Sequence, residues 1–277
     1  MEKHILSQSF LLSEDYIEPR CPFTKPDDIE SIPVRRVLEK LDEYMSNGDF
    51  SSAEKHLNYW ISEAEYQRDY RGKLTVLNEQ IGLYRKDMQK EKGLSCVKEA
   101  LSLARALHLD DNIVMGTTLI NAATAYRAFD MPAEALPLYQ EAKQIYESLL
   151  DPEDFRMGGL YNNMALTEEA LGQHDEAETH FFQALSIMTD VDGSELEAAI
   201  TYCNLADLTY ISYQDPLRAQ LISDYLNKAK ALLLNEFIPH NGYYRYVCEK
   251  CAPAFAFFND EATYHILDDL SKAKGDV

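Results

Sequence analysis

A segment of this chain recurs 42 residues later, and this recurrence constrains the fold more than any other feature of the sequence. Residues 118–146 align without a gap to residues 160–188 and share identical residues at Asn121/Asn163, Ala123/Ala165, Ala128/Ala170, Glu134/Glu176, Ala135/Ala177, Ala142/Ala184 and Ile145/Ile187. Repetition with this period is typical of helix pairs arranged in an array. Each pair exposes an apolar face that only a neighbouring pair can bury, so we predict an all-α stacked solenoid.

The charge of the chain restricts its partners. The 277 residues include 47 acidic and 26 basic side chains, which gives a formal net charge of −21 and a pI of about 4.6. Such a surface repels phosphate groups and anionic lipids, so we expect no nucleic acid and no membrane as partners. The amino terminus lacks the pattern of a secretory signal, and no run of residues has the length of a membrane span. Five scattered cysteines fit a reducing compartment, and we expect a cytoplasmic protein.

Helical spacing of apolar residues divides the chain into an N-terminal arm or cap and a solenoid domain. The arm covers residues 1–32, where several prolines interrupt any helical pattern. The solenoid covers residues 33–277, with repeats at about 33–68, 73–108, 113–150, 155–190 and 195–235 and capping helices at about 240–274. The fifth repeat aligns only if about three residues are inserted near Asp215 and Pro216. Pro253 should end or kink the first capping helix.

The junctions between paired helices resemble those of the tetratricopeptide repeat. Residues 48–53 (GDFSSA) and residues 172–177 (GQHDEA) match the glycine, the ring and the alanine that join the two helices of such a repeat. The 42-residue period and the Asn-Asn-Met-Ala run resemble the subgroup typified by kinesin light chain. This resemblance implies a right-handed superhelical α-solenoid of about five repeats of this type, which binds a peptide or protein without a cofactor. Some bacterial peptide-sensing regulators of this family hold a peptide backbone with asparagines on their inner helices.

Three asparagines occupy the same position in successive first helices. Asn121, Asn163 and Asn204 are separated by 42 and 41 residues. The first helices line the inner surface of such a superhelix, so we predict a row of amides that binds an extended peptide backbone. A side-chain amide can both donate to and accept from a backbone. Asn78 and Asn162 lie one helical step from this row. The alternative is that these amides bond neighbouring helices and set the joint between repeats.

Charged and aromatic side chains project toward the same predicted groove. The basic residues are Arg35, Arg85, Lys86 and Arg127 in its amino-terminal half, and the acidic residues are Glu169 and Asp207 in its carboxyl-terminal half. We include Arg85 and Arg127 among the peptide-binding candidates, because a groove of mixed sign can orient a ligand. Exposed arginines paired with neighbouring glutamates are the alternative. Tyr126 and Tyr210, at the ends of first helices, could add contacts, although core packing is the better interpretation for Tyr126.

No motif in the sequence indicates catalysis. Phosphate loops, zinc-protease motifs, nucleophile elbows and dinucleotide turns are absent, so we predict a protein that is not an enzyme and has no catalytic or metal-binding residues. Cys248 and Cys251 form a C-x-x-C pair, which we interpret as packed. A redox or zinc role is the alternative, with His240 as an unconvincing third ligand.

These observations together predict an adaptor that binds a peptide or protein partner in a concave groove. Three alternatives remain open. The chain could be a peptide-sensing regulatory module, a self-assembling module that forms a homodimer, or a thiol or metal protein.

Overall fold

The computed structural model describes residues 31–189, 193–212 and 217–273, and all secondary structure in these ranges is helical. The predicted arm lies outside the described residues except for its last two positions, as do Asp215 and Pro216. Twelve helices follow one another along the described chain: α1 (Val34–Ser46), α2 (Phe50–Tyr66), α3 (Tyr70–Lys86), α4 (Lys90–Ala106), α5 (Ile113–Ala128), α6 (Pro132–Leu149), α7 (Phe155–Ala170), α8 (His174–Met188), α9 (Glu195–Ser212), α10 (Arg218–Leu233), α11 (Gly242–Phe257) and α12 (Glu261–Lys272).

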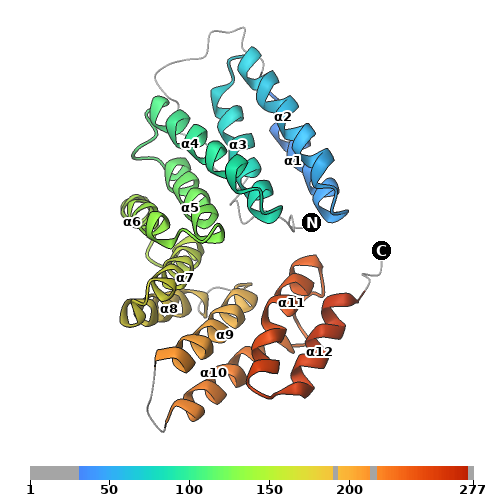
Figure 1. The fold of residues 1–277 in the computed structure, drawn as a ribbon, viewed down its shortest axis with the longest axis vertical. Helices are drawn as coiled ribbons and strands as arrows, with labels where there is room; N and C mark the ends of the chain where they lie inside the picture. The colour runs from blue at the N-terminus through green and yellow to red at the C-terminus, as the bar shows by residue number, and fades with distance from the viewer. Residues whose placement is uncertain (1–30, 190–192, 213–216, 274–277) are drawn as a thin grey trace. The chain divides into compact units, whose positions relative to one another are not determined.

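The helices belong to two compact units. The first unit ends at Leu149 and holds α1 to α6, and the second begins at Leu150 and holds α7 to α12. Within each unit a helix packs against its predecessor in most steps, and Figure 1 shows the members of each pair lying side by side. The odd-numbered helices, which we call the first helices, also contact one another, α3 with α5, α7 with α9 and α9 with α11. The prediction of an all-α array of helix pairs is therefore confirmed.

A residue in the left-handed conformation follows most of the helices that precede a tight turn. Gly48 and Gly172 take φ values of 68° and 75°, as the predicted junction motif requires. Other turns place a residue with a side chain there, including Met88 at φ 53° and Asp130 at φ 60°. These three-residue turns reverse the chain so that the second helix of each pair can lie against the first.

Small residues allow the paired helices to approach closely. Ala135 and Ala177 are fully buried at equivalent positions of α6 and α8. Gly116 of α5 lies under the ring of Tyr146, and a Cβ at this position would overlap that ring. Tyr146 is itself fully buried, so the missing side chain of one helix makes room for the ring of the other.

The N-terminal edge of the described chain is fixed by one buried residue. Ile32 is 3% exposed, and its backbone N–H donates to Oδ2 of Asp69 over 3.0 Å. Oδ1 of Asp69 caps α3 by accepting from the N–H of Gly72. Because Asp69 provides this cap, α3 begins at Tyr70, three residues before the predicted start of the second repeat.

Two other local predictions can be compared with the structure. Pro253 lies inside α11 and does not end that helix. Its ring is on the exposed side, where water can satisfy the carbonyl that loses its intrahelical donor. In the fifth pair, α9 ends at Ser212 and α10 begins only at Arg218, whereas α7 and α8 are separated by three residues. The extra length agrees with the insertion that the alignment required.

Enlarging a buried alanine tests the packing. We expect Ala177→Leu to lower the free energy of unfolding of the full chain by roughly 1 to 3 kcal/mol, because the added atoms have no space between α7 and α8. Urea denaturation measures the change. Ala231→Leu, at an exposed position of α10, is the matched control and should change the stability little. Equal stability of the two variants would contradict this account.

Candidate functional site

Two first helices of the first unit are joined by an amide pair. Nδ2 of Asn121 on α5 donates to Oδ1 of Asn78 on α3 over 3.0 Å. Nδ2 of Asn78 donates to Oγ1 of Thr118 and to the carbonyl of Leu74, both over 3.1 Å. Asn78 is only 8% exposed. Its amide is therefore committed to the contact between α3 and α5.

The second unit repeats this arrangement on α7 and α9. Nδ2 of Asn204 donates to Oδ1 of Asn162 over 3.2 Å, and Oγ1 of Thr201 donates to the same oxygen over 3.0 Å. In both units an asparagine of one first helix faces a Thr-x-x-Asn sequence in the next. The alternative that these amides bond neighbouring helices thus describes part of what they do.

The later asparagine of each pair keeps bonding capacity. Asn121 and Asn204 are half-buried, and each is held by a single N–H. Within the described ranges of the chain, their Oδ1 atoms have no hydrogen-bond partner. Each pair therefore orients an amide whose oxygen can accept a further hydrogen bond.

Asn163 differs from the other members of the predicted row. It is half-buried on α7, and its Nδ2 donates to the carbonyl of Gly159 on the same helix over 3.0 Å. The row is also divided, since Asn121 belongs to the first unit and Asn163 and Asn204 belong to the second. Asn78 and Asn121 come together, as do Asn162 and Asn204.

The predicted basic residues all lie in the first unit. Arg35 is exposed on α1 and pairs through Nε with Glu39 over 3.0 Å, which is the simple surface pair considered from the sequence. Arg85 and Arg127 are half-buried at the ends of α3 and α5, and Lys86 is exposed beside Arg85.

The surroundings of Lys86 contain both signs of charge. Partial desolvation of the ammonium group and the positive charge of the adjacent Arg85 lower the pKa of Lys86, while the negative charges of Glu79 and Asp42 raise it. The cation thus lies among other charged groups of α1 and α3.

The acidic and aromatic candidates of the second unit lie at the ends of its first helices. Glu169 is half-buried near the end of α7, and Asp207 is exposed on α9. Tyr210, one turn after Asp207, is 42% exposed, while Tyr126 in the first unit is half-buried. Sequence reasoning missed Phe257, which is 59% exposed at the end of α11 and contacts Tyr210.

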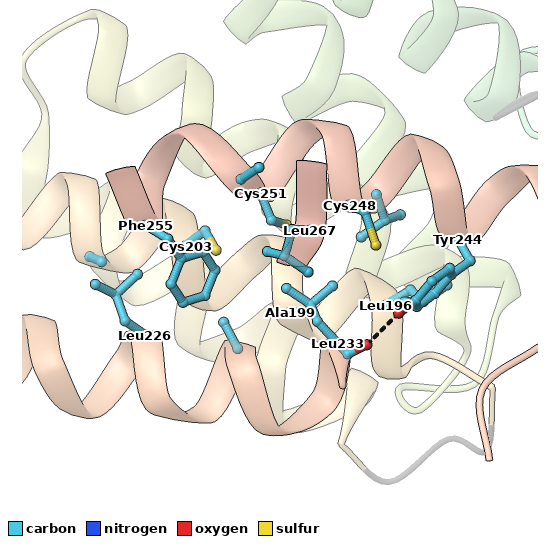
Figure 2. Close-up of a cluster of buried hydrophobic side chains, with 14 of the residues drawn as sticks. Leu196, Ala199, Cys203, Leu226, Leu233, Tyr244, Cys248, Cys251, Phe255 and Leu267 are labelled. Atoms are coloured by element: carbon cyan, nitrogen blue, oxygen red, sulfur yellow. Dashed lines mark hydrogen bonds between the residues drawn. The ribbon is translucent and has the colours of Figure 1, made fainter. Parts of the chain in front are cut away.

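The C-x-x-C pair is part of a buried apolar cluster. Figure 2 shows Cys248 and Cys251 on α11 among side chains of α9, α10 and α12, and both are buried. Cys251 lies in the same buried cluster as Cys203 of α9. The interaction with Cys251 and burial raise the pKa of Cys203 well above its usual value, and burial raises the pKa of Cys248 to about 11. Thiols held protonated are poor nucleophiles and poor metal ligands.

Among the described residues there is neither a cluster that could bind a metal ion nor a helix that could span a membrane. Within residues 31–189, 193–212 and 217–273, histidine, cysteine and acidic side chains form no group of three or more arranged to bind a metal ion. Helices of the described chain are too short or too polar to cross a bilayer.

The segments that match a known protein family coincide with the helix pairs. The model of the tetratricopeptide repeat matches residues 73–148 and 156–232, which together make up more than half of the chain. The chain belongs to the tetratricopeptide-repeat family. Both matched segments contain two consecutive helix pairs, and each segment includes one of the amide pairs.

Solved structures of tetratricopeptide-repeat proteins share this fold at low sequence identity. A Podosopora anserina protein described by its kinesin light chain nearly identical TPR-like repeats is 17% identical with a TM-score of 0.52, over 72% of this chain and 93% of its own. BtubC (BKLC) from P. vanneervenii is 19% identical with a TM-score of 0.52, over 87% and 91%. NprR in complex with its cognate peptide NprX is 17% identical with a TM-score of 0.57, over 86% and 66%.

These similarities establish the fold and the resemblance to kinesin light chain-type repeats. No curated protein matches the sequence. The chemistry of the partner must therefore be argued from the residues of this chain.

Removing the buried amide tests its role in the joint. We expect Asn78→Ala to lower the free energy of unfolding by about 1 to 3 kcal/mol, because Nδ2 of Asn121 loses its acceptor inside the contact between α3 and α5. Urea denaturation of the full chain measures the loss. Asn227→Ala, at an exposed position of α10, should be nearly neutral. A neutral Asn78→Ala would remove the amide from the list of stabilising contacts.

The buried thiols give a prediction that depends on pH. In a Cys21→Ser variant, the native protein should react slowly with a disulfide reagent at pH 8, and all four remaining thiols should react quickly in denaturant. Stability should fall as pH rises above about 9, because the thiols of the unfolded chain ionise before those of the folded chain. Rapid labelling of the native protein at pH 8 would contradict this interpretation.

Proposed function

We propose that this chain is a non-enzymatic adaptor that binds an extended peptide segment, or a helix of a partner, on the first helices of its units. Each unit presents on its first helices a half-buried asparagine, Asn121 or Asn204, whose orientation is fixed by a bond to a neighbouring helix. The single observation that carries the proposal is that the Oδ1 atoms of both have no partner within the described part of the chain. Fixed amides of this kind can bind a peptide backbone without first losing side-chain freedom.

The predicted peptide-binding residues contribute unequally to this proposal. Asn121, Asn163 and Asn204 are the residues for which we propose backbone contacts. Asn78 and Asn162 hold their partners in place. Arg85 and Arg127, half-buried at the ends of α3 and α5, are proposed to attract an acidic group of the ligand to the first unit.

Peptide sensing is a narrower form of the same function. NprR, which shares the fold, is described in complex with a cognate peptide, and this supports a peptide as the ligand class. The four buried thiols fit a reducing cytoplasm, and the charge of −21 argues against nucleic acid as a partner. Self-association into a homodimer remains a separate hypothesis, which light scattering of the purified chain can test.

Substituting Asn163 tests the binding role. A displayed random-peptide library is selected on the full chain, and the affinity of the selected peptides is measured by fluorescence anisotropy. Asn163→Ala should weaken binding about five-fold or more, since a lost hydrogen bond to the peptide backbone is worth roughly 1 kcal/mol.

Two controls separate binding from stability. The urea midpoint of Asn163→Ala is measured beside its affinity, so that a loss of affinity at an unchanged midpoint reports on binding alone. Asn227→Ala on α10 should bind the selected peptides like the wild type. Unchanged affinity of Asn163→Ala would argue against the proposal, as would a library that yields no binding peptide.

A further inference from the structure

An exposed cluster of aromatic rings lies at the ends of α9 and α11. The ring centroids of Tyr210 and Phe257 are 5.1 Å apart, those of Tyr210 and Phe258 are 5.8 Å apart, and those of the two phenylalanines are 4.9 Å apart. All three pairs meet edge to face. Tyr210 is 42% exposed and Phe257 is 59% exposed, although both are large apolar side chains. Clusters of this kind serve as anchors in protein interfaces.

The cluster adjoins a row of polar and apolar residues on α9. Asn204, Asp207 and Ile211 are spaced by three and four residues, so they follow one face of the helix. Ile211 is 47% exposed, and Asp207 is exposed one turn before Tyr210. The oriented amide, a carboxylate and an apolar surface therefore follow one another along the helix.

Asp207 has no cation beside it among the described residues. Its side chain forms no ion pair or hydrogen bond with the described residues, and partial desolvation of the carboxyl raises its pKa. The contacts of Tyr243 with Glu197 and of Tyr210 with Phe257 show that α9 and α11 run side by side with an offset of 46 to 47 residues. This register puts Asp207 level with Pro253, which is exposed and uncharged.

Neither Arg218 nor Lys250 forms an ion pair with this carboxylate among the described residues. Cζ of Arg218 on α10 lies 5.1 Å from the centroid of the Tyr210 ring, and Nη1 of Arg218 donates to the backbone carbonyl of Tyr210 over 3.2 Å. Lys250, on the preceding turn of α11, forms no ion pair with Asp207. A carboxylate that is partly desolvated and lacks a counter-ion gains more from an incoming cation than a fully hydrated one does.

We infer that this α9–α11 surface, made up of Asn204, Asp207, Tyr210, Ile211 and Phe257, binds a segment of a partner protein in which a lysine or arginine adjoins a large apolar residue. The basic side chain pairs with Asp207, and the apolar side chain packs against Tyr210, Ile211 and Phe257. Asn204 bonds the backbone of the segment. The inference rests on the proposed function, to which it adds the chemistry of the ligand.

The charge of the whole chain favours the same partner. A net charge of −21 attracts basic segments and repels acidic ones at long range. An arginine of the partner could also lie over the exposed ring of Phe257, since guanidinium groups stack favourably on aromatic faces. An acidic segment would meet the uncompensated Asp207 and lose this contribution.

Library selection followed by matched substitutions tests the inference. Peptides are selected from a displayed random library on the full chain, and the bound pool should be enriched in lysine or arginine next to leucine, isoleucine, phenylalanine or tryptophan. Asp207→Asn should weaken the selected peptides about five-fold or more, with a smaller dependence of affinity on salt. Asp224→Asn removes the same charge from an exposed position of α10 and should have no effect.

A charge exchange makes the test specific. Replacing the basic residue of a selected peptide by glutamate should abolish binding to the wild type and restore it, at least in part, with Asp207→Lys. Phe257→Ser should weaken the same peptides, and circular dichroism should show that each variant remains helical.

Failure of this inference can be told apart from failure of the proposed function. If peptides bind and depend on Asn163 but show no basic enrichment, or bind Asp207→Asn like Asp224→Asn, the proposed function stands and this inference is wrong. Acidic peptides whose binding is lost in Phe257→Ser also overturn it, because they would occupy the same surface. If no peptide binds the chain at all, both fail.

Discussion

Close approach between helices, made possible by missing side chains, is the constraint on which the rest of this structure depends. Ala135 and Ala177 are buried completely, and Gly116 accommodates the ring of Tyr146. A residue of ordinary size at any of these positions would push the paired helices apart. The hydrogen bond between Asn78 of α3 and Asn121 of α5 then joins neighbouring pairs that are each packed in this way.

The amide pairs place a directional hydrogen bond within the otherwise apolar contacts between first helices. Hydrophobic burial is proportional to area and tolerates sliding, whereas an amide hydrogen bond requires particular atoms at about 3 Å. Asn78 and Asn162 supply the acceptor, and Asn121 and Asn204 supply the donor. The same bond that joins two helices leaves the Oδ1 of the donor residue without a partner among the described residues, so the proposed binding role is compatible with the structural one in a single side chain.

The local sequence predicted most of the fold but little of the candidate site. The 42-residue recurrence fixed the helix pairs, because the spacing of small residues such as Ala177 follows directly from helix geometry. It could not distinguish Asn78, which is buried, from Asn121, since both lie on nearly the same side of their helices and only the neighbouring helix separates them. Phe257 escaped notice because its exposure depends on what α9 places opposite it. Pro253 was expected to end or kink its helix. It does not end α11, since a proline on the solvent side of a helix leaves a carbonyl that water can satisfy.

The amide pairs also restrict how the first helices can slide along each other. A shift of α5 by one turn relative to α3 would move Thr118 and Asn121 away from Asn78 and leave its nearly inaccessible amide bonded only to the carbonyl of Leu74, so one alignment satisfies the amide best. The partners are separated by 40 and 43 residues in the first unit and by 39 and 42 in the second. An asparagine followed about forty residues later by Thr-x-x-Asn is therefore a sequence signature of a fixed register, and it can be sought in other helical repeat proteins whose alignment is ambiguous.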